Sequence, residues 1–155
     1  MLDHSRSRLA VVATTPDDSH LWNLVGVQLK LEERGFEVRN LGACTPTELL
    51  AETVRGLRPD LLAISTINGH GAISMAGVMQ ALEQYQVKRV APIVVGGLLT
   101  TDPATLGHAE AELLQLGCAG VFTGDRAWER FDQFLRRIGI NTKASADEDG
   151  FQTDE

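Results

Sequence analysis

Five short apolar runs alternate with five longer segments of helical periodicity, and this alternation limits the possible folds more than any other feature of the chain. The runs are nearly unbroken in aliphatic residues, as is typical of strands covered on both faces. We expect strands at residues 9–13, 36–41, 60–65, 90–95 and 120–123. Strict alternation predicts an α/β fold: a single doubly wound, five-stranded parallel sheet of flavodoxin-like (Rossmann-like) type, with strand order 2-1-3-4-5.

The segments between the strands place apolar residues three or four positions apart, which predicts helices with one buried face. Gly35 is expected to end the first helix, and Asp102 to cap the fourth. The run Thr45-Pro46-Thr47-Glu48 predicts a capping box with proline at the first helical position. The predicted buried faces are Leu24, Val27 and Leu31; Leu50, Val54 and Leu57; Met75, Val78, Met79 and Leu82; Leu106, Ala109, Leu113 and Leu116; and Trp128, Phe131, Leu135 and Ile138.

The length of 155 residues is that of one domain. We expect a frayed N-terminus at residues 1–7, a domain at residues 8–140, and a disordered acidic tail at residues 141–155. Five acids and one lysine in that tail account for four of the seven net negative charges. The tail is interpreted as solvated, with contact to a partner as the alternative.

The charge and hydropathy of the chain argue against several classes of partner. No basic surface is predicted, so nucleic acid is not an expected partner. No apolar run has membrane-spanning length and no secretory signal is present, so we expect a cytoplasmic protein that does not contact membranes. Cys44 and Cys118 lack the spacing of a zinc site and are expected to be buried, small apolar residues.

Polar and small residues follow four of the five predicted strands. In a parallel sheet these loops share one edge, where ligands bind. A histidine with a carboxylate nearby is arranged as metal-binding histidines are, because the carboxylate fixes the orientation of the ring. Glycines allow the backbone to approach a ligand closely. The pattern predicts a slot for a large planar or elongated ligand with a histidine at its mouth. The residues are Asp18 and His20; Ser65, Thr66, Gly69 and Gly71; Gly96 and Gly97; and Thr123 and Gly124.

Other ligand-binding motifs do not fit. The sequence has no Walker A motif and no nucleophile elbow, and residues 69–74 lack the third glycine of a dinucleotide fingerprint. A phosphorelay receiver domain, which shares this topology, requires an aspartate at the end of strand three and a lysine at the end of strand five. Those positions hold Ser65 and Thr123.

Three spaced motifs resemble the signature of cobalamin-binding domains. They are Asp18-x-His20-x-x-Asn23, Ser65-x-Ile67 and Gly96-Gly97, beside the family pattern Asp-x-His-x-x-Gly, Ser-x-Leu and Gly-Gly. The resemblance extends over about residues 8–140 and is strongest to the small (sigma or S) subunit of glutamate (methylaspartate) mutase. Asn23 in place of glycine is the main departure, and Trp22 adds bulk beside it, either in the core or at the rim of the corrin ring.

The resemblance implies a role for each matching residue. His20 would displace the dimethylbenzimidazole base and become the lower axial ligand of cobalt, with Asp18 bound to its other ring nitrogen. The nucleotide tail would enter between the first helix and the sheet, where Ser65 would meet the base. The implied cofactor-binding set is Asp18, Ser19, His20, Leu21, Asn23, Ser65, Thr66, Ile67, Gly69, Gly96, Gly97, Thr123 and Gly124, with His20 as the metal ligand.

The implied function is that of the cobalamin-binding subunit of an adenosylcobalamin-dependent carbon-skeleton mutase. A larger barrel subunit would bind the substrate and form a heteromer with this chain, which carries no catalytic residue of its own and would be inactive alone. The alternatives are a corrinoid carrier for methyl transfer that uses methylcobalamin, and a non-catalytic sensor or degenerate module. Methyl carriers usually have a helical-bundle domain and sensors an output domain, and the sequence predicts neither.

Three further expectations concern residues outside the signature. His70 and His108 are interpreted as surface histidines, with contact between His70 and the corrin as the alternative. Trp128 and Phe131 are interpreted as a core stripe rather than a binding platform. The loop and helix start at residues 15–28 are expected to be mobile before the cofactor binds, since a groove for the nucleotide would otherwise stand open.

Overall fold

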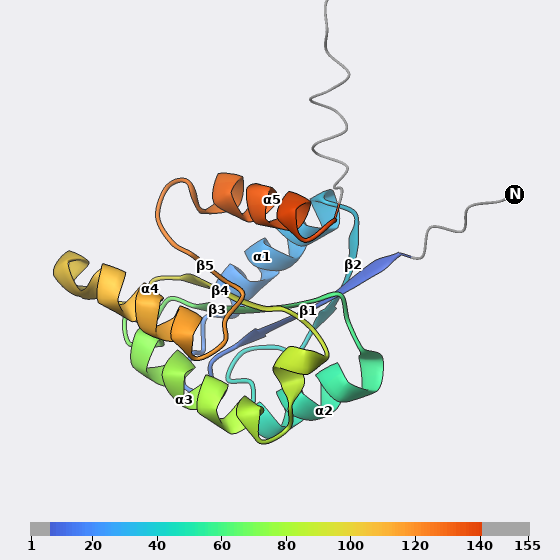
Figure 1. Ribbon diagram of the computed structural model, residues 1–155, viewed down its shortest axis with the longest axis horizontal. Coiled ribbons are helices and arrows are strands. Elements are labelled where there is room, and N and C mark those ends of the chain that lie inside the picture. Colours follow the sequence, from blue (N-terminus) through green and yellow to red (C-terminus); the bar gives the residue numbers. More distant parts are fainter. Residues whose placement is uncertain (1–6, 141–155) are drawn as a thin grey trace, which may run out of the picture.

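The predicted parallel sheet is confirmed by a computed structural model, which describes residues 7–140. Its strand order is β2-β1-β3-β4-β5, and every neighbouring pair is parallel (Figure 1). Because β1 lies between β2 and β3, the chain reverses its direction of winding after β2, which leaves the ends of β1 and β3 side by side. The strands are β1 (Arg8–Thr14), β2 (Phe36–Asn40), β3 (Leu61–Thr66), β4 (Ile93–Gly97) and β5 (Gly120–Phe122).

Helices cover both faces of the sheet. Figure 1 shows α1 and α5 on one face and α2, α3 and α4 on the other. The helices are α1 (Leu21–Glu33), α2 (Thr47–Leu57), α3 (Gly71–Glu83), α4 (Leu106–Gln115) and α5 (Ala127–Arg137), with short 3₁₀ turns η1 (Val87–Arg89) and η2 (Pro103–Thr105). In the described part of the chain, no helix combines the length and the apolar character needed to cross a membrane.

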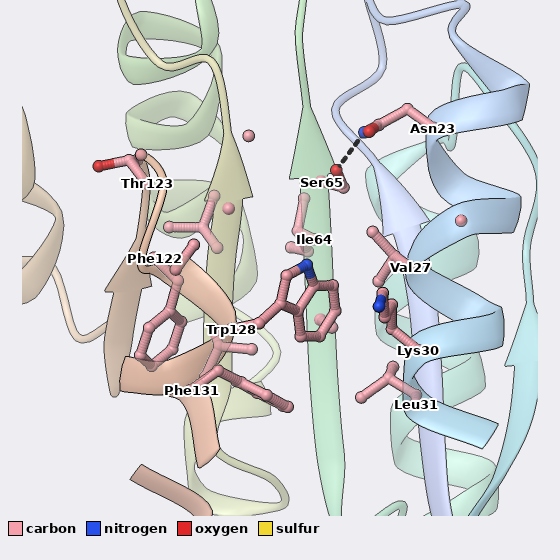
Figure 2. A pocket seen from close by; sticks show the side chains of 18 of the residues that line it. Asn23, Val27, Lys30, Leu31, Ile64, Ser65, Phe122, Thr123, Trp128 and Phe131 are labelled. Carbon is pink, nitrogen blue, oxygen red and sulfur yellow. Dashed lines mark hydrogen bonds between the residues drawn. The ribbon is translucent and has the colours of Figure 1, made fainter. Parts of the chain in front are cut away.

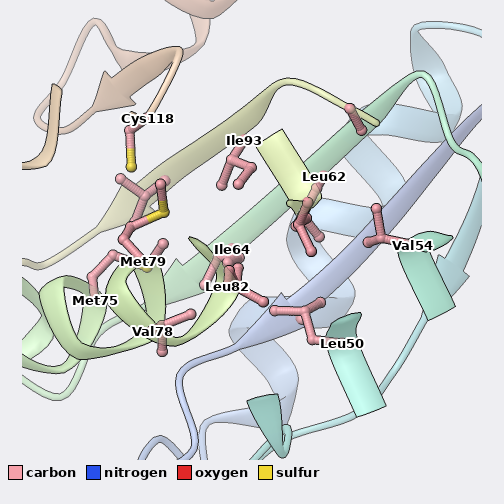
Figure 3. Close-up of a cluster of buried hydrophobic side chains, with 14 of the residues drawn as sticks. Leu50, Val54, Leu62, Ile64, Met75, Val78, Met79, Leu82, Ile93 and Cys118 are labelled. Atoms are coloured by element: carbon pink, nitrogen blue, oxygen red, sulfur yellow. The ribbon is translucent and has the colours of Figure 1, made fainter. Parts of the chain in front are cut away.

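The two faces of the sheet form separate cores, because successive strand residues point to opposite sides. Leu62 and Ile64 of β3 belong to the larger cluster with α2 and α3 (Figure 3), whereas Leu61 and Ala63 belong to the smaller cluster with α1 and α5. Cys118 lies in the larger cluster, and burial raises the pKa of its thiol to about 12. The smaller cluster is the one beside the candidate site.

Several local predictions are wrong in detail. The capping box at the start of α2 does not form, because the Thr45 hydroxyl donates to the Gly42 carbonyl at 2.8 Å and accepts from the Thr14 amide at 3.0 Å. Pro46 is therefore the residue before the helix rather than its first residue. Asp102 caps the short turn η2, by accepting from the Ala104 amide at 2.9 Å, rather than the fourth helix as predicted, because α4 begins only at Leu106.

Other predictions differ at the ends of elements. β4 begins at Ile93 rather than Val90, because the amides of Val90 and Ala91 donate to the Val87 carbonyl of η1 instead of joining the sheet. α5 ends before Ile138, which is 42% exposed, and Phe134 takes the predicted buried place. Cys44 is exposed rather than buried. The expected tail at 141–155 and all but the last residue of the expected N-terminal segment lie outside the described residues.

Candidate functional site

Asp18 and His20 form a hydrogen-bonded pair in the loop between β1 and α1. The Asp18 side chain is fully buried, and its Oδ1 accepts from the His20 amide at 2.9 Å and from His20 Nδ1 at 2.7 Å. Burial opposes the charged form, but the hydrogen bonds outweigh it and hold the pKa of Asp18 below its ordinary value. Since an ionised carboxylate only accepts, Nδ1 of the half-exposed ring carries a proton, and in the neutral imidazole the lone pair is on Nε2.

The end of β3 holds the other oxygen of Asp18. Oδ2 accepts from the Thr66 hydroxyl at 2.8 Å and from the Ile67 amide at 2.7 Å. The carboxylate therefore has four donors from two neighbouring strand ends, so the orientation of the imidazole is fixed by the sheet itself. This arrangement is typical of a histidine that serves as a metal ligand.

Gly97 allows β4 to reach this cluster. Its φ is +109°, and a Cβ there would lie 2.1 Å from the Thr66 carbonyl oxygen. The Leu98 amide donates to that same oxygen at 2.8 Å. The second glycine of the Gly-Gly motif is thus required by the close approach of two backbones, independently of any ligand.

A cavity of about 500 Å³ lies between α1 and α5, on the face of the sheet that carries the smaller core (Figure 2). Its upper end in Figure 2 is at the carboxyl ends of the strands, where Asn23 and Ser65 face each other. Below them the walls are mainly apolar side chains. The cavity is lined by Asn23, Gly26, Val27, Lys30 and Leu31 of α1, Ser65 of β3, Gly96 and Gly97 of β4, Phe122, Thr123 and Gly124 at the end of β5, and Trp128 and Phe131 of α5.

Comparison with known proteins identifies the family of this chain. The family model of the B12 binding domain matches residues 8–128. The chain belongs to the B12-binding domain family. The resemblance seen in the three motifs is thereby confirmed, and cobalamin is the cofactor of the domain.

Three similar proteins illustrate the range of this family. The transcriptional repressor CarH of Myxococcus xanthus is 33% identical over 125 residues, which are 81% of this chain and 39% of the repressor. The glutamate mutase sigma subunit of Halobacterium salinarum is 28% identical over 119 residues, 77% of this chain and 78% of the subunit. The monomethylamine corrinoid protein of Methanosarcina barkeri has the same fold, with a TM-score of 0.64 and 19% identity over 85% of this chain and 58% of that protein.

The chain therefore spans less than half the length of the repressor that it matches, and about four fifths of the sigma subunit. The corrinoid protein shares the fold of this chain, and the cobalamin-binding family is shown by the family model.

The residues implied by the signature fall into two groups in the structure. Asp18, His20, Thr66 and the Ile67 amide form the hydrogen-bonded cluster at the edge of the sheet, whereas the other group lines the cavity. The cluster and its flanking loops contain Asp18, Ser19, His20, Leu21, Thr66, Ile67 and Gly69, and the cavity group contains Asn23, Ser65, Gly96, Gly97, Thr123 and Gly124. The first group can hold a metal-bearing ring, and the second can hold an elongated tail.

Two polar residues of the cavity have unexpected partners. Asn23 Nδ2 donates to Ser65 Oγ at 2.5 Å, so the residue that replaces the motif glycine is bound to the second motif (Figure 2). The Thr123 hydroxyl donates to Glu110 at 2.7 Å and points away from the cavity. Thr123 therefore lines the cavity without offering it a hydroxyl. Trp22 is 85% exposed at the rim rather than in the core.

The contribution of aromatic residues to the cavity wall was not predicted from the sequence. Trp128 and Phe131 do belong to the smaller core cluster, as predicted, but they also form a wall of the cavity together with Phe122. Their ring centroids lie 5.3–5.5 Å apart in edge-to-face geometry. The signal available in the sequence was the grouping of four aromatic residues between 122 and 134.

The residues present fit cobalamin, which has a flat corrin ring around cobalt and a nucleotide tail that ends in an aromatic base. His20 offers an imidazole Nε2 at the sheet edge, and the nearby cavity of about 500 Å³ is lined mainly by apolar residues. Imidazole nitrogen is a common ligand of first-row transition metals.

Proposed function

We propose that this domain binds adenosylcobalamin with His20 as the lower axial ligand of cobalt and with the nucleotide tail in the cavity between α1 and α5. We further propose that it is the cobalamin-binding subunit of a carbon-skeleton mutase of the glutamate mutase type, acting with a separate substrate-binding barrel subunit. The observation that carries the proposal is the buried Asp18 carboxylate, which binds Nδ1 of the half-exposed His20 ring and leaves Nε2 for a ligand.

Each part of the site has a definite task in this proposal. Asp18 keeps the proton on Nδ1 and increases the basicity of Nε2, while Thr66 and the Ile67 amide hold Asp18 in place. Ser65 is available to the tail once Asn23 releases it. When bound, adenosylcobalamin supplies a weak cobalt–carbon bond whose homolysis provides a radical. The chain's own residues bind and orient the cofactor, and the substrate chemistry belongs to the partner.

The mutase assignment is supported by the sigma-subunit relatives, whose match covers 77% of this chain and 78% of the Halobacterium protein. A second candidate is supported by the 33% identity to CarH: a cobalamin-responsive module of a transcriptional regulator. Both candidates use the same cofactor site. They differ in whether the corrin face meets a substrate-binding subunit.

The cofactor site is tested by visible spectroscopy of the purified protein with adenosylcobalamin and with methylcobalamin. We expect the spectrum of histidine-ligated, base-off cobalamin, its loss in His20→Ala, and its retention in His108→Ala, which removes an exposed histidine of α4. Binding that is unchanged in His20→Ala would refute ligation by His20. A preference for methylcobalamin would favour the methyl carrier.

The mutase role is tested by adding the large subunit of a glutamate mutase and measuring isomerisation. Activity that requires this chain, adenosylcobalamin and His20 supports the proposal. Histidine-ligated binding without activity, and without association with the large subunit, would reject the mutase role and favour the regulatory module.

A further inference from the structure

The inner part of the cavity is a slot with one aromatic and one aliphatic wall. Figure 2 shows the Trp128 indole between the side of α5 that carries Phe131 and the side of α1 that carries Val27 and Leu31. Trp128 is only half-buried, so one surface of the ring remains available to the cavity. A slot of this kind accepts a planar aromatic group by stacking and apolar contact.

A buried cation holds Trp128 in place. The Arg34 guanidinium carbon lies 4.8 Å from the centroid of the indole, and the Arg34 side chain is only 8% exposed. Asp132 binds the guanidinium with both oxygens, at 2.5 Å and 3.0 Å, and Arg34 also donates to the Lys30 carbonyl at 2.9 Å. Arg34 and Lys30 are at the end of α1, and Asp132 is on α5. The indole is therefore fixed relative to both walls of the slot.

Core packing alone does not require an ion pair beside Trp128, as a neighbouring aromatic residue shows. Phe134, on the same helix, packs against Phe122 at a centroid distance of 5.6 Å and is buried without lining the cavity. Trp128 instead keeps surface toward the cavity and has a bidentate ion pair beside it. A desolvated guanidinium next to an indole stabilises one ring position, which pre-organises the slot.

We propose that Trp128 is a specificity determinant for the lower base of the cofactor's nucleotide, and that Arg34 is its positioning residue. The slot selects corrinoids whose tail ends in a planar bicyclic base over corrinoids that lack the base. This inference rests on the proposed function, since it assigns the inner end of the cavity to the tail.

The test compares two ligands, adenosylcobalamin and adenosylcobinamide, which lacks the nucleotide and its base. Stacking of a base on an aromatic side chain corresponds to about 5- to 150-fold in affinity. We expect Trp128→Leu to weaken adenosylcobalamin binding by at least about 5-fold and to change adenosylcobinamide binding less than about twofold. Trp128→Phe should restore most of the affinity, and Arg34→Met should give an intermediate loss for adenosylcobalamin alone.

Phe134→Leu is the matched control, because it removes an aromatic ring from α5 that does not line the cavity. Equal losses for the two ligands in Trp128→Leu, or the same selective loss in Phe134→Leu, would overturn the proposal. If Trp128→Leu fails to fold, Arg34→Met decides by the same ratio of affinities, and an unchanged ratio in that variant overturns the proposal. Failure of the cofactor site itself is distinct, since the unaltered protein would then bind neither ligand.

Discussion

At the scale of single residues, Asp18 makes the most hydrogen bonds in the site, so its side chain is the hardest to replace. Its four donors come from His20, Thr66 and Ile67, and none can be replaced by water at a fully buried carboxylate. Asparagine at position 18 has one oxygen and one NH₂ group, and the NH₂ group would have to face one of those donors. Either the Ile67 amide loses its acceptor or the His20 ring must change its tautomer.

We therefore predict that Asp18→Asn lowers the free energy of unfolding by about 2–4 kcal/mol, because buried donors are left unpaired. Cobalamin affinity should fall by about 10- to 100-fold, since the orientation of the histidine is lost. Urea unfolding and spectral titration measure the two effects. Asp17→Asn is the control, because Asp17 bonds to Ser74 at an exposed position and an amide oxygen can accept that bond equally well. Similar effects in both variants would contradict the prediction.

Asn23 stands where the signature has glycine, and its side chain makes a hydrogen bond that glycine could not make. Its amide is bound to Ser65 where both residues line the cavity, and we expect a tail to enter only after this bond breaks. A net hydrogen bond of about 0.5–1.5 kcal/mol corresponds to about 2- to 13-fold in rate. We predict that Asn23→Gly accelerates the association of adenosylcobalamin by this factor, as measured by stopped-flow absorbance.

The tail-free ligand provides the control for Asn23. Association of adenosylcobinamide should be unchanged in Asn23→Gly, because that ligand places nothing between α1 and the sheet. Glycine in the first turn of α1 should also cost about 0.5 kcal/mol in stability. An equal acceleration for both ligands would show that Asn23 does not close the tail cavity.

At the scale of elements, the strands and helices were predictable because each one is determined by its own local pattern. The buried run of β3 and the spacing of Met75 and Leu82 in α3 need no knowledge of the rest of the chain. The wrong prediction at the start of α2 concerns a group with competing partners. The Thr45 hydroxyl could bond within its helix or to the sheet, and only the folded structure brings Thr14 close enough for the second choice.

The same reasoning explains the candidate site. Its residue types and the strand ends that carry them followed from the motifs, because the topology alone brings those ends together. The bond between Asn23 and Ser65 spans 42 positions and was not predictable from spacing. Whether Trp128 packs fully or lines a cavity depends on the distance between α1 and α5, which no local pattern specifies.

The contact between the ends of β3 and β4 leads to a prediction about Gly97. Alanine there would combine a φ of +109° with an overlap on the Thr66 carbonyl oxygen. We expect Gly97→Ala to destabilise the fold by about 3–5 kcal/mol in urea unfolding. Gly77→Ala is the matched control, because Gly77 lies inside α3 with open space around it, and it should add up to about 1 kcal/mol. Tolerance of alanine at Gly97 would contradict the close contact between the two strand ends.

At the scale of the whole molecule, the two faces of the sheet are unequally packed. α3 buries Gly71, Met75, Val78, Met79 and Leu82, whereas α1 buries only Leu24 and Leu31. The rest of the inner face of α1 lines the cavity, so fewer contacts resist its local opening. The side of the molecule proposed to receive the tail is thus the side with the weaker core.

We predict that amides of residues 15–28 exchange with solvent faster than those of α3 in the cofactor-free protein. Adenosylcobalamin should slow exchange in residues 15–28 and leave α3 unchanged, because a tail in the cavity would supply the contacts that α1 lacks. Hydrogen–deuterium exchange with mass spectrometry measures both segments in one experiment, and His20→Ala should lose most of the protection at equal ligand concentration. Strong, uniform protection of residues 15–28 without cofactor would contradict the prediction. Cofactor-induced protection spread equally over α2 and α3 would do the same, since stabilisation would then be global rather than confined to the weaker face.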